Sequence, residues 1–185
     1  DVAYGQKKSR KLDLLDYWRC YFHSSIFFKR LYFYKFSIHS IYNSCHFWLF
    51  RMEENLRQLA KNDKNRIIKI ALFGPESTGK TTLSKQLAEY YNTKWVPEFA
   101  REYLQEKWDN HQQICDIDDM LPIAYGQTKL ENDTVLQANK YLFCDTNLMV
   151  TKVFSEVYYN YCEPALDQAA REHEYDLFFL TDIDV

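Results

Sequence analysis

Nine residues from Gly74 to Thr82 have the types and the spacing of a phosphate-binding loop. The stretch reads Gly-Pro-Glu-Ser-Thr-Gly-Lys-Thr-Thr and matches the pattern G-x-x-x-x-G-K-[ST] at every fixed position. Its two glycines allow backbone angles that a side chain would obstruct, so successive N–H groups can turn inward around an anion. The start of the expected following helix adds partial positive charge. We therefore predict that the loop binds the phosphates of a nucleoside triphosphate, with contacts from Gly74, Glu76, Ser77, Thr78, Gly79, Lys80, Thr81 and Thr82.

Lys80 and Asp145 are the candidates for catalysis, and Thr81 and Asp145 are the candidates for binding Mg²⁺. Lys80 would place a mobile positive charge on the β- and γ-phosphates, and the hydroxyl of Thr81 would be a direct ligand of Mg²⁺. Asp145 ends the apolar run 141–145, and a carboxylate at the end of such a strand lies beside the bound phosphates. There it would hold Mg²⁺ or accept the proton of an attacking hydroxyl. A helix N-cap is the simpler alternative, because Thr and Asn follow this Asp.

Three further polar residues are candidates for binding an acceptor substrate. Glu98 and Arg101 follow the second predicted strand, and ligands bind beyond the carboxyl ends of strands in open parallel sheets. Glu98 would accept hydrogen bonds from sugar hydroxyls, and Arg101 would pair with phosphate or with Glu98. Gln127, in an otherwise apolar helical stretch, would contact a base or another ring. The alternatives are an exposed ion pair at a helix start for Glu98 and Arg101, and an ordinary polar helix position for Gln127.

Strands and helices alternate in the hydrophobic pattern from residue 67 onward. Four short apolar runs predict buried strands at 67–73, 93–96, 141–145 and 175–181. Between them apolar residues recur at helical spacing, with a helix predicted over 98–108 and N-terminal signals at Asp116 and at Glu163-Pro164. This alternation predicts an α/β fold with a three-layer parallel sheet, and the loop makes it a P-loop NTPase.

Residues 1–51 differ from the rest of the chain in composition and charge. They contain nine Lys or Arg against three Asp, are rich in Phe and Tyr, and lack Glu, Pro and Thr. The longest uncharged run, 36–50, is shorter than the about 20 apolar residues that a membrane span needs. A basic, aromatic arm that contacts a membrane surface or a nucleic acid is one alternative. We interpret the segment as a non-native or disordered upstream extension, and we expect no nucleic-acid or membrane partner.

Residues 52–66 are expected to form a short helix and a linker before a domain at 67–185. The five cysteines are odd in number and lack C-x-x-C spacing, so neither a disulfide framework nor a zinc site is predicted. A reducing cytoplasm fits this cysteine usage best. The five histidines are scattered, and we expect them at the surface or in the extension rather than as metal ligands.

Five motifs, in this order, resemble the ribosylnicotinamide kinase domain of bacterial bifunctional proteins that also carry a nicotinamide-mononucleotide adenylyltransferase and regulate NAD salvage. The motifs are Gly74-Pro-Glu-Ser-Thr-Gly-Lys-Thr-Thr82, Val96-Pro-Glu-Phe-Ala-Arg-Glu-Tyr103, Ile123-Ala-Tyr-Gly-Gln127, Phe143-Cys-Asp-Thr-Asn147 and Phe154-Ser-Glu-Val-Tyr-Tyr159. The similarity covers about residues 67–185, and five motifs in sequence are far more specific than the phosphate loop alone.

The resemblance implies a nucleoside-kinase-like fold that transfers the γ-phosphate of ATP to the 5′-hydroxyl of nicotinamide riboside, with Mg²⁺. Lys80 and Thr81 would then bind the phosphates and the metal, and Asp145 would bind the metal or accept the proton of the hydroxyl. Glu98, Arg101 and Gln127 would lie in the nucleoside region. Two rivals remain: another P-loop nucleoside or small-molecule kinase, and an AAA-like ATP-binding regulatory module without metabolite kinase activity.

The sequence departs from the family pattern at both ends. An adenylyltransferase would have to come from a fused domain, as in relatives, or from a partner chain. After the fourth predicted strand the family continues with an arginine-bearing lid, a further helix and a last strand, whereas this sequence stops at residue 185. We therefore expect a fold that is incomplete at the C-terminus, and a fragment with weak or no catalysis.

Overall fold

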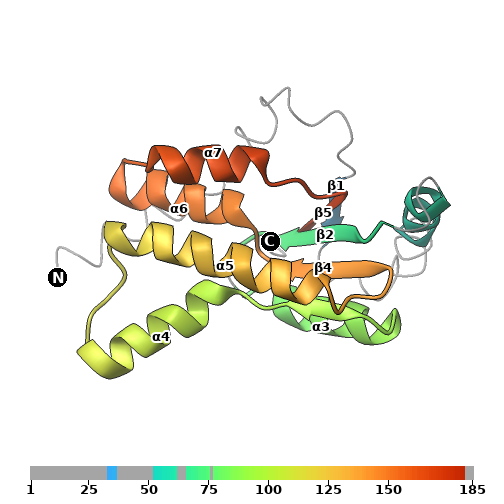
Figure 1. Cartoon of the computed structure of the whole chain (residues 1–185), viewed down its shortest axis with the longest axis horizontal. Coiled ribbons are helices and arrows are strands. Elements are labelled where there is room, and N and C mark those ends of the chain that lie inside the picture. The colour runs from blue at the N-terminus through green and yellow to red at the C-terminus, as the bar shows by residue number, and fades with distance from the viewer. Residues whose placement is uncertain (1–32, 37–51, 62–65, 76, 182–185) are drawn as a thin grey trace. The chain divides into compact units, whose positions relative to one another are not determined.

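A computed structural model describes residues 33–36, 52–61, 66–75 and 77–181 of the chain (Figure 1). These residues belong to one compact unit that spans 32–185. Several predictions fall outside the described residues: most of the extension 1–51, residues 62–65 of the linker, Glu76 of the phosphate loop, and residues 182–185.

Parallel strands form one sheet in the order β1-β5-β2-β4-β3. The strands are β1 (Phe33–Phe36), β2 (Ile68–Phe73), β3 (Lys94–Val96), β4 (Tyr141–Asp145) and β5 (Leu177–Thr181). The four strands predicted from apolar runs are confirmed as β2 to β5. A strand at β1 was not expected, and it pairs with β5 at the edge of the sheet.

Helices connect the strands close to the predicted positions (Figure 1). Residues 52–61 are helical, and the later helices are α3 (Lys80–Tyr90), α4 (Phe99–His111), α5 (Met120–Val135), α6 (Leu148–Tyr159) and α7 (Pro164–Glu172). α4 continues past its predicted end at Trp108, and Gln112 ends it in the left-handed conformation with φ 53°. Among the residues that the structure describes, no helix has the length and apolarity required to cross a bilayer.

Side chains near the helix starts explain two of these boundaries. The side-chain oxygen of Asn147 accepts a hydrogen bond from the N–H of Val150 at 3.0 Å and thereby caps α6. Asp116, the predicted cap, forms a capping box with Asp119 around the short 3-10 turn η2 (Ile117–Asp119), which leads into α5. The predicted N-cap is therefore confirmed, with one turn of 3-10 helix between it and α5.

Different helices cover the two faces of the sheet. Side chains alternate along a strand, so Phe143 of β4 faces one layer while Leu142 and Cys144 face the other. Phe143 packs in a cluster with residues of β2, α3 and helix 52–61. Leu142 and Cys144 pack with residues of β3 and α5, and α5, α6 and α7 pack on one another (Figure 1). This is the three-layer α/β arrangement that the sequence predicts.

The carboxyl ends of the central strands meet at one edge of the sheet. Leu72 pairs with Asp145, and Phe73 pairs with Leu180. Neighbouring strands lie about 4.8 Å apart. The loop after β2, Asp145 at the end of β4 and Thr181 at the end of β5 are therefore neighbours in space.

Candidate functional site

The phosphate loop joins β2 to α3 and needs glycine at both fixed positions. Gly74 has φ +144°, and a Cβ on it would lie 2.2 Å from the carbonyl oxygen of Thr181. Gly79 has φ +80° and open space around it, so its backbone angle alone requires glycine. Gly79 occupies the N-cap of α3 without a capping side chain, so the first N–H groups of α3 can bind an anion.

Lys80 lies against the carbonyl groups that open the loop. Its Nζ donates hydrogen bonds to Gly74 O at 3.0 Å and to Pro75 O at 2.6 Å. The ammonium is thus already held at the loop, where it can exchange carbonyl oxygens for phosphate oxygens. Of the other predicted contacts, Ser77 and Thr82 are exposed at the surface of this loop.

Thr81, which is partly buried, and Asp145, which is buried, form a hydrogen-bonded pair beside Lys80. The Thr81 hydroxyl donates a hydrogen bond to Asp145 Oδ2 at 2.5 Å. Asp145 is 1% exposed, and within the described part of the chain its Oδ1 has no hydrogen-bond partner. Burial of an uncompensated carboxylate oxygen is unfavourable, so the site favours a cation or a donor at Oδ1. The N-cap of α6 is Asn147, so Asp145 does not have the capping role that is its alternative interpretation.

Two buried threonines connect the loop to the neighbouring strand. The Thr78 hydroxyl donates to Pro75 O at 2.8 Å, and it lies 2.6 Å from the hydroxyl of Thr181 at the end of β5. Sequence reasoning missed Thr181. Its signal was available: like Asp145, it is a polar residue that ends an apolar strand.

Glu98 and Arg101 lie at the start of α4, just beyond the carboxyl end of β3. Arg101 Nη2 donates to Glu98 Oε2 at 3.0 Å, with side-chain exposures of 71% for Arg101 and 28% for Glu98. β3 pairs in parallel with β4, so this ion pair and Asp145 belong to the same edge of the sheet. An exposed pair contributes little stability, and its carboxylate is accessible to a polar ligand.

Gln127 is buried and bonds backbone atoms beside Glu98. Its Oε1 accepts the N–H of Phe99 at 2.8 Å, and its Nε2 donates to Pro97 O at 3.3 Å. The preceding Gly126 packs against the Phe99 ring, and a Cβ there would lie 2.1 Å from that ring. Both residues therefore fix the turn that carries Glu98. Direct contact of Gln127 with a substrate ring stays a prediction.

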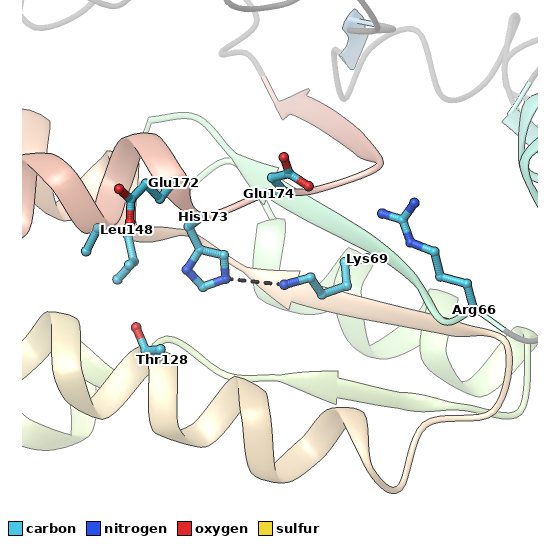
Figure 2. A pocket seen from close by; sticks show the side chains of 8 residues that line it. Arg66, Lys69, Thr128, Leu148, Glu172, His173 and Glu174 are labelled. Carbon is cyan, nitrogen blue, oxygen red and sulfur yellow. Dashed lines mark hydrogen bonds between the residues drawn. The ribbon is translucent and has the colours of Figure 1, made fainter.

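A separate cavity of about 450 Å³ lies toward the amino ends of the strands (Figure 2). Lys69, early in β2, and His173, after α7, point toward each other there, and their nitrogens are 3.4 Å apart. Oε1 of the buried Glu131 lies 2.8 Å from Lys69 Nζ and 2.9 Å from His173 Nε2, and its Oε2 accepts from Tyr175 at 2.7 Å. We call Lys69, Glu131, His173 and Tyr175 the Glu131 cluster.

The Glu131 cluster is a structural ion network rather than part of the phosphate site. Burial alone would raise the pKa of Glu131, but hydrogen bonds and charge from His173 and Lys69 lower that pKa to about 2. His173 is 11% exposed, so the expected surface position is wrong for this histidine. In the described residues no group of three or more His, Cys, Asp or Glu side chains could hold a metal ion.

Comparison with known proteins places the chain among NAD-related relatives. A family model described as "AAA domain" matches residues 69–185. Two curated proteins, the Trifunctional NAD biosynthesis/regulator protein NadR of Salmonella typhimurium and that of Escherichia coli, are each 31% identical over 111 residues. Each match covers 60% of this chain and 27% of the relative. The chain thus spans about a quarter of the length of these relatives, and the resemblance predicted from the five motifs is confirmed.

Solved structures support the same fold. A crystal structure of NadR protein in complex with NR aligns with TM-score 0.56 and 24% identity over 74% of this chain and 40% of that chain. A crystal structure of NadR protein in complex with NAD and AMP-PNP aligns with TM-score 0.56 and 23% identity over 75% and 42%. At these identities the likeness shows the α/β P-loop NTPase fold alone.

Proposed function

Since the chain belongs to the AAA domain family, whose model matches residues 69–185, we propose that it binds ATP and phosphorylates nicotinamide riboside at its 5′-hydroxyl. The observation that carries the proposal is the convergence of three groups at one edge of the sheet. These are the glycine loop, the ammonium of Lys80, and the Thr81–Asp145 pair, whose buried Oδ1 has no hydrogen-bond partner among the residues that the structure describes.

Thr81 and Asp145 fit Mg²⁺. Each has a side-chain oxygen that can be a ligand. In kinases Mg²⁺ is usually bound by one or two carboxylates and the substrate phosphates, and it keeps several waters. Among the described residues, Asp145 Oδ1 is the atom that a cation would compensate. Bound there, the ion would neutralise charge on the transferring phosphate.

The chain's own residues would position the reacting groups. The N–H groups at the start of α3 and the Lys80 ammonium would hold the β- and γ-phosphates, so that the γ-phosphate faces the acceptor. The bond from Thr81 to Asp145 Oδ2 favours a metal-holding role for this carboxylate. In the alternative role, Oδ1 would accept the proton of the attacking hydroxyl.

The acceptor would lie beyond the carboxyl end of β3. The carboxylate of Glu98 is partly exposed and paired with Arg101, so it can accept hydrogen bonds from ribose hydroxyls. Gln127 would fix that turn through Pro97 and Phe99. A relative crystallised in complex with NR supports a nucleoside of this kind, as does the name "NAD biosynthesis/regulator protein" of the curated relatives.

The test measures ATP binding and product formation separately on the full 185-residue chain. Nicotinamide riboside, uridine and a nucleoside monophosphate are offered with ATP and Mg²⁺, and phosphorylated products are quantified. We expect nicotinamide mononucleotide as the main product, and its loss in Lys80→Ala. Lys85→Ala, an exposed lysine of the same helix above the Trp95 ring, serves as the matched control. ATP consumption that none of these nucleosides or nucleotides changes would favour the regulatory module instead.

A further inference from the structure

A chain of buried hydroxyl groups links the end of β5 to the phosphate loop. Thr181 is 1% exposed and Thr78 is 6% exposed. The Thr78 hydroxyl lies 2.6 Å from the Thr181 hydroxyl and 2.8 Å from Pro75 O, and the Thr181 hydroxyl lies 3.2 Å from Phe73 O.

The hydrogens available decide how these contacts are made. Two hydroxyl hydrogens serve three contacts, and the carbonyl oxygens can only accept. Two oxygens at 2.6 Å must share a hydrogen, so either Thr181 donates to Thr78, which donates to Pro75 O, or the direction is reversed and ends at Phe73 O. The first arrangement has the shorter bonds, because Pro75 O is closer at 2.8 Å than Phe73 O at 3.2 Å.

This hydroxyl chain ends on an atom that Lys80 also uses. Pro75 O accepts from Thr78 Oγ1 and from Lys80 Nζ, the latter at 2.6 Å. When Lys80 turns to a phosphate, it gives up this carbonyl. The Thr78 bond keeps Pro75 O paired, which lowers the cost of that exchange, because an unpaired, partly buried carbonyl is unfavourable.

The backbone of Thr181 also shapes the loop. Phe73 pairs with Leu180, so Thr181 lies beside Gly74, and the space that a Cβ of Gly74 would need is filled by the carbonyl oxygen and hydroxyl of Thr181, at 2.2 Å and 2.5 Å. The first glycine of the loop is therefore required by its neighbour on β5 as well as by its own φ of +144°.

We propose that Thr181 is a positioning residue for nucleotide binding, acting through the Thr78 hydroxyl to hold the phosphate loop in its binding shape. This deepens the proposed function and rests on its ATP-binding part. The proposal predicts that removal of the Thr181 hydroxyl weakens ATP binding, although Thr181 belongs to β5 and not to the loop itself.

The test compares variants that differ in the hydroxyl. ATP affinity is measured by isothermal titration calorimetry with Mg²⁺, and thermal unfolding is followed in parallel, on the full chain. Thr181→Val should raise the Kd for ATP about tenfold, the value of one hydrogen bond, and Thr181→Ser should stay within about threefold of wild type. Thr181→Ala against Thr181→Ser gives the same comparison should the valine variant fail to fold.

Two controls separate positioning from general stability. Thr93→Val removes another partly buried hydroxyl, which donates a 2.5 Å hydrogen bond to Tyr141 O and is not part of the phosphate loop. This variant should lower the Tm but leave the Kd for ATP unchanged. Thr78→Ala combined with Thr181→Val should cost no more affinity than the larger single change, because both act through one chain of bonds.

The outcomes are distinct. If Thr181→Val lowers the Tm as Thr93→Val does but leaves ATP affinity intact, the positioning role is overturned. If the wild-type chain binds ATP but makes no nicotinamide mononucleotide, the kinase proposal fails while the variants still decide the role of Thr181. Absence of ATP binding by the wild-type chain would overturn both.

Discussion

Thr81 Oγ1 donates a hydrogen bond to Asp145 Oδ2 at 2.5 Å and thereby joins the first turn of α3 to the end of β4. The two residues are far apart in the sequence, and the parallel pairing of β2 with β4 brings them together. The pair leaves the second oxygen of a buried carboxylate unpartnered among the described residues. That oxygen defines where a cation or a substrate proton would be received.

Replacing this carboxylate should separate its two candidate roles. Asp145→Asn keeps the shape but removes the charge, and we expect turnover of nicotinamide riboside to fall by about 100-fold or more. If Asp145 holds Mg²⁺, the Mg²⁺ concentration needed for half-maximal activity rises. If it accepts the proton, that concentration stays constant while turnover still falls. Asp133→Asn, on the exposed side of α5, is the control, and unchanged turnover in Asp145→Asn would refute both roles.

A second prediction concerns Gln127, whose buried side chain is hydrogen-bonded to backbone atoms rather than exposed to a ligand. Gln127→Leu removes the acceptor of the Phe99 N–H, so the free energy of unfolding in urea should fall by about 1–3 kcal/mol. The KM for the nucleoside should rise with it, since the turn that carries Glu98 loosens, while the Kd for ATP should change little. Gln86→Leu, at an exposed position of α3, is the matched control. A raised KM at unchanged stability would instead indicate direct contact with the substrate.

The main elements of the fold could be predicted because buried parallel strands leave a plain signal. Ile68–Phe73 is apolar at every position except Lys69, and Lys69 is also its one residue that is not buried. Asp116 and Asn147 show how local helix signals work, since each caps the turn that directly follows it. The predicted end of α4 at Trp108 is too early, because no glycine or proline marks the true end at His111. A left-handed Gln112 ends the helix instead.

The candidate site was predictable only where its residues follow a local pattern. The loop and Asp145 each have a local signal, a glycine spacing or a carboxylate that ends a strand. The role of Thr181 depends on β5 lying next to β2, and the bonds of Gln127 depend on α5 lying against the start of α4. Such adjacency between distant segments is a product of folding and has no fixed spacing in the sequence.

The same limit explains why the Glu131 cluster was missed. Lys69, Glu131 and His173 come from β2, α5 and the segment after α7, and each looks like an ordinary charged residue in its own segment. Once together, they place a 1% exposed carboxylate under two basic groups and the Tyr175 hydroxyl. Because both oxygens of this buried carboxylate have hydrogen-bond partners when it is ionised, the stability of the folded chain depends on its charge.

Acid should therefore weaken the fold through Glu131. Its pKa is lowered to about 2 from 4.5, so its contribution is fully present above about pH 5 and is lost as the pH falls toward 2. That contribution is about 3 kcal/mol. Urea unfolding of the wild-type chain and of Glu131→Gln should show a stability difference that is largest near pH 7 and shrinks toward pH 3. Glu172→Gln, exposed at the end of α7, is the control and should follow the wild-type curve. A difference between wild type and Glu131→Gln that stays constant with pH would show that the charge of Glu131 does not stabilise the fold.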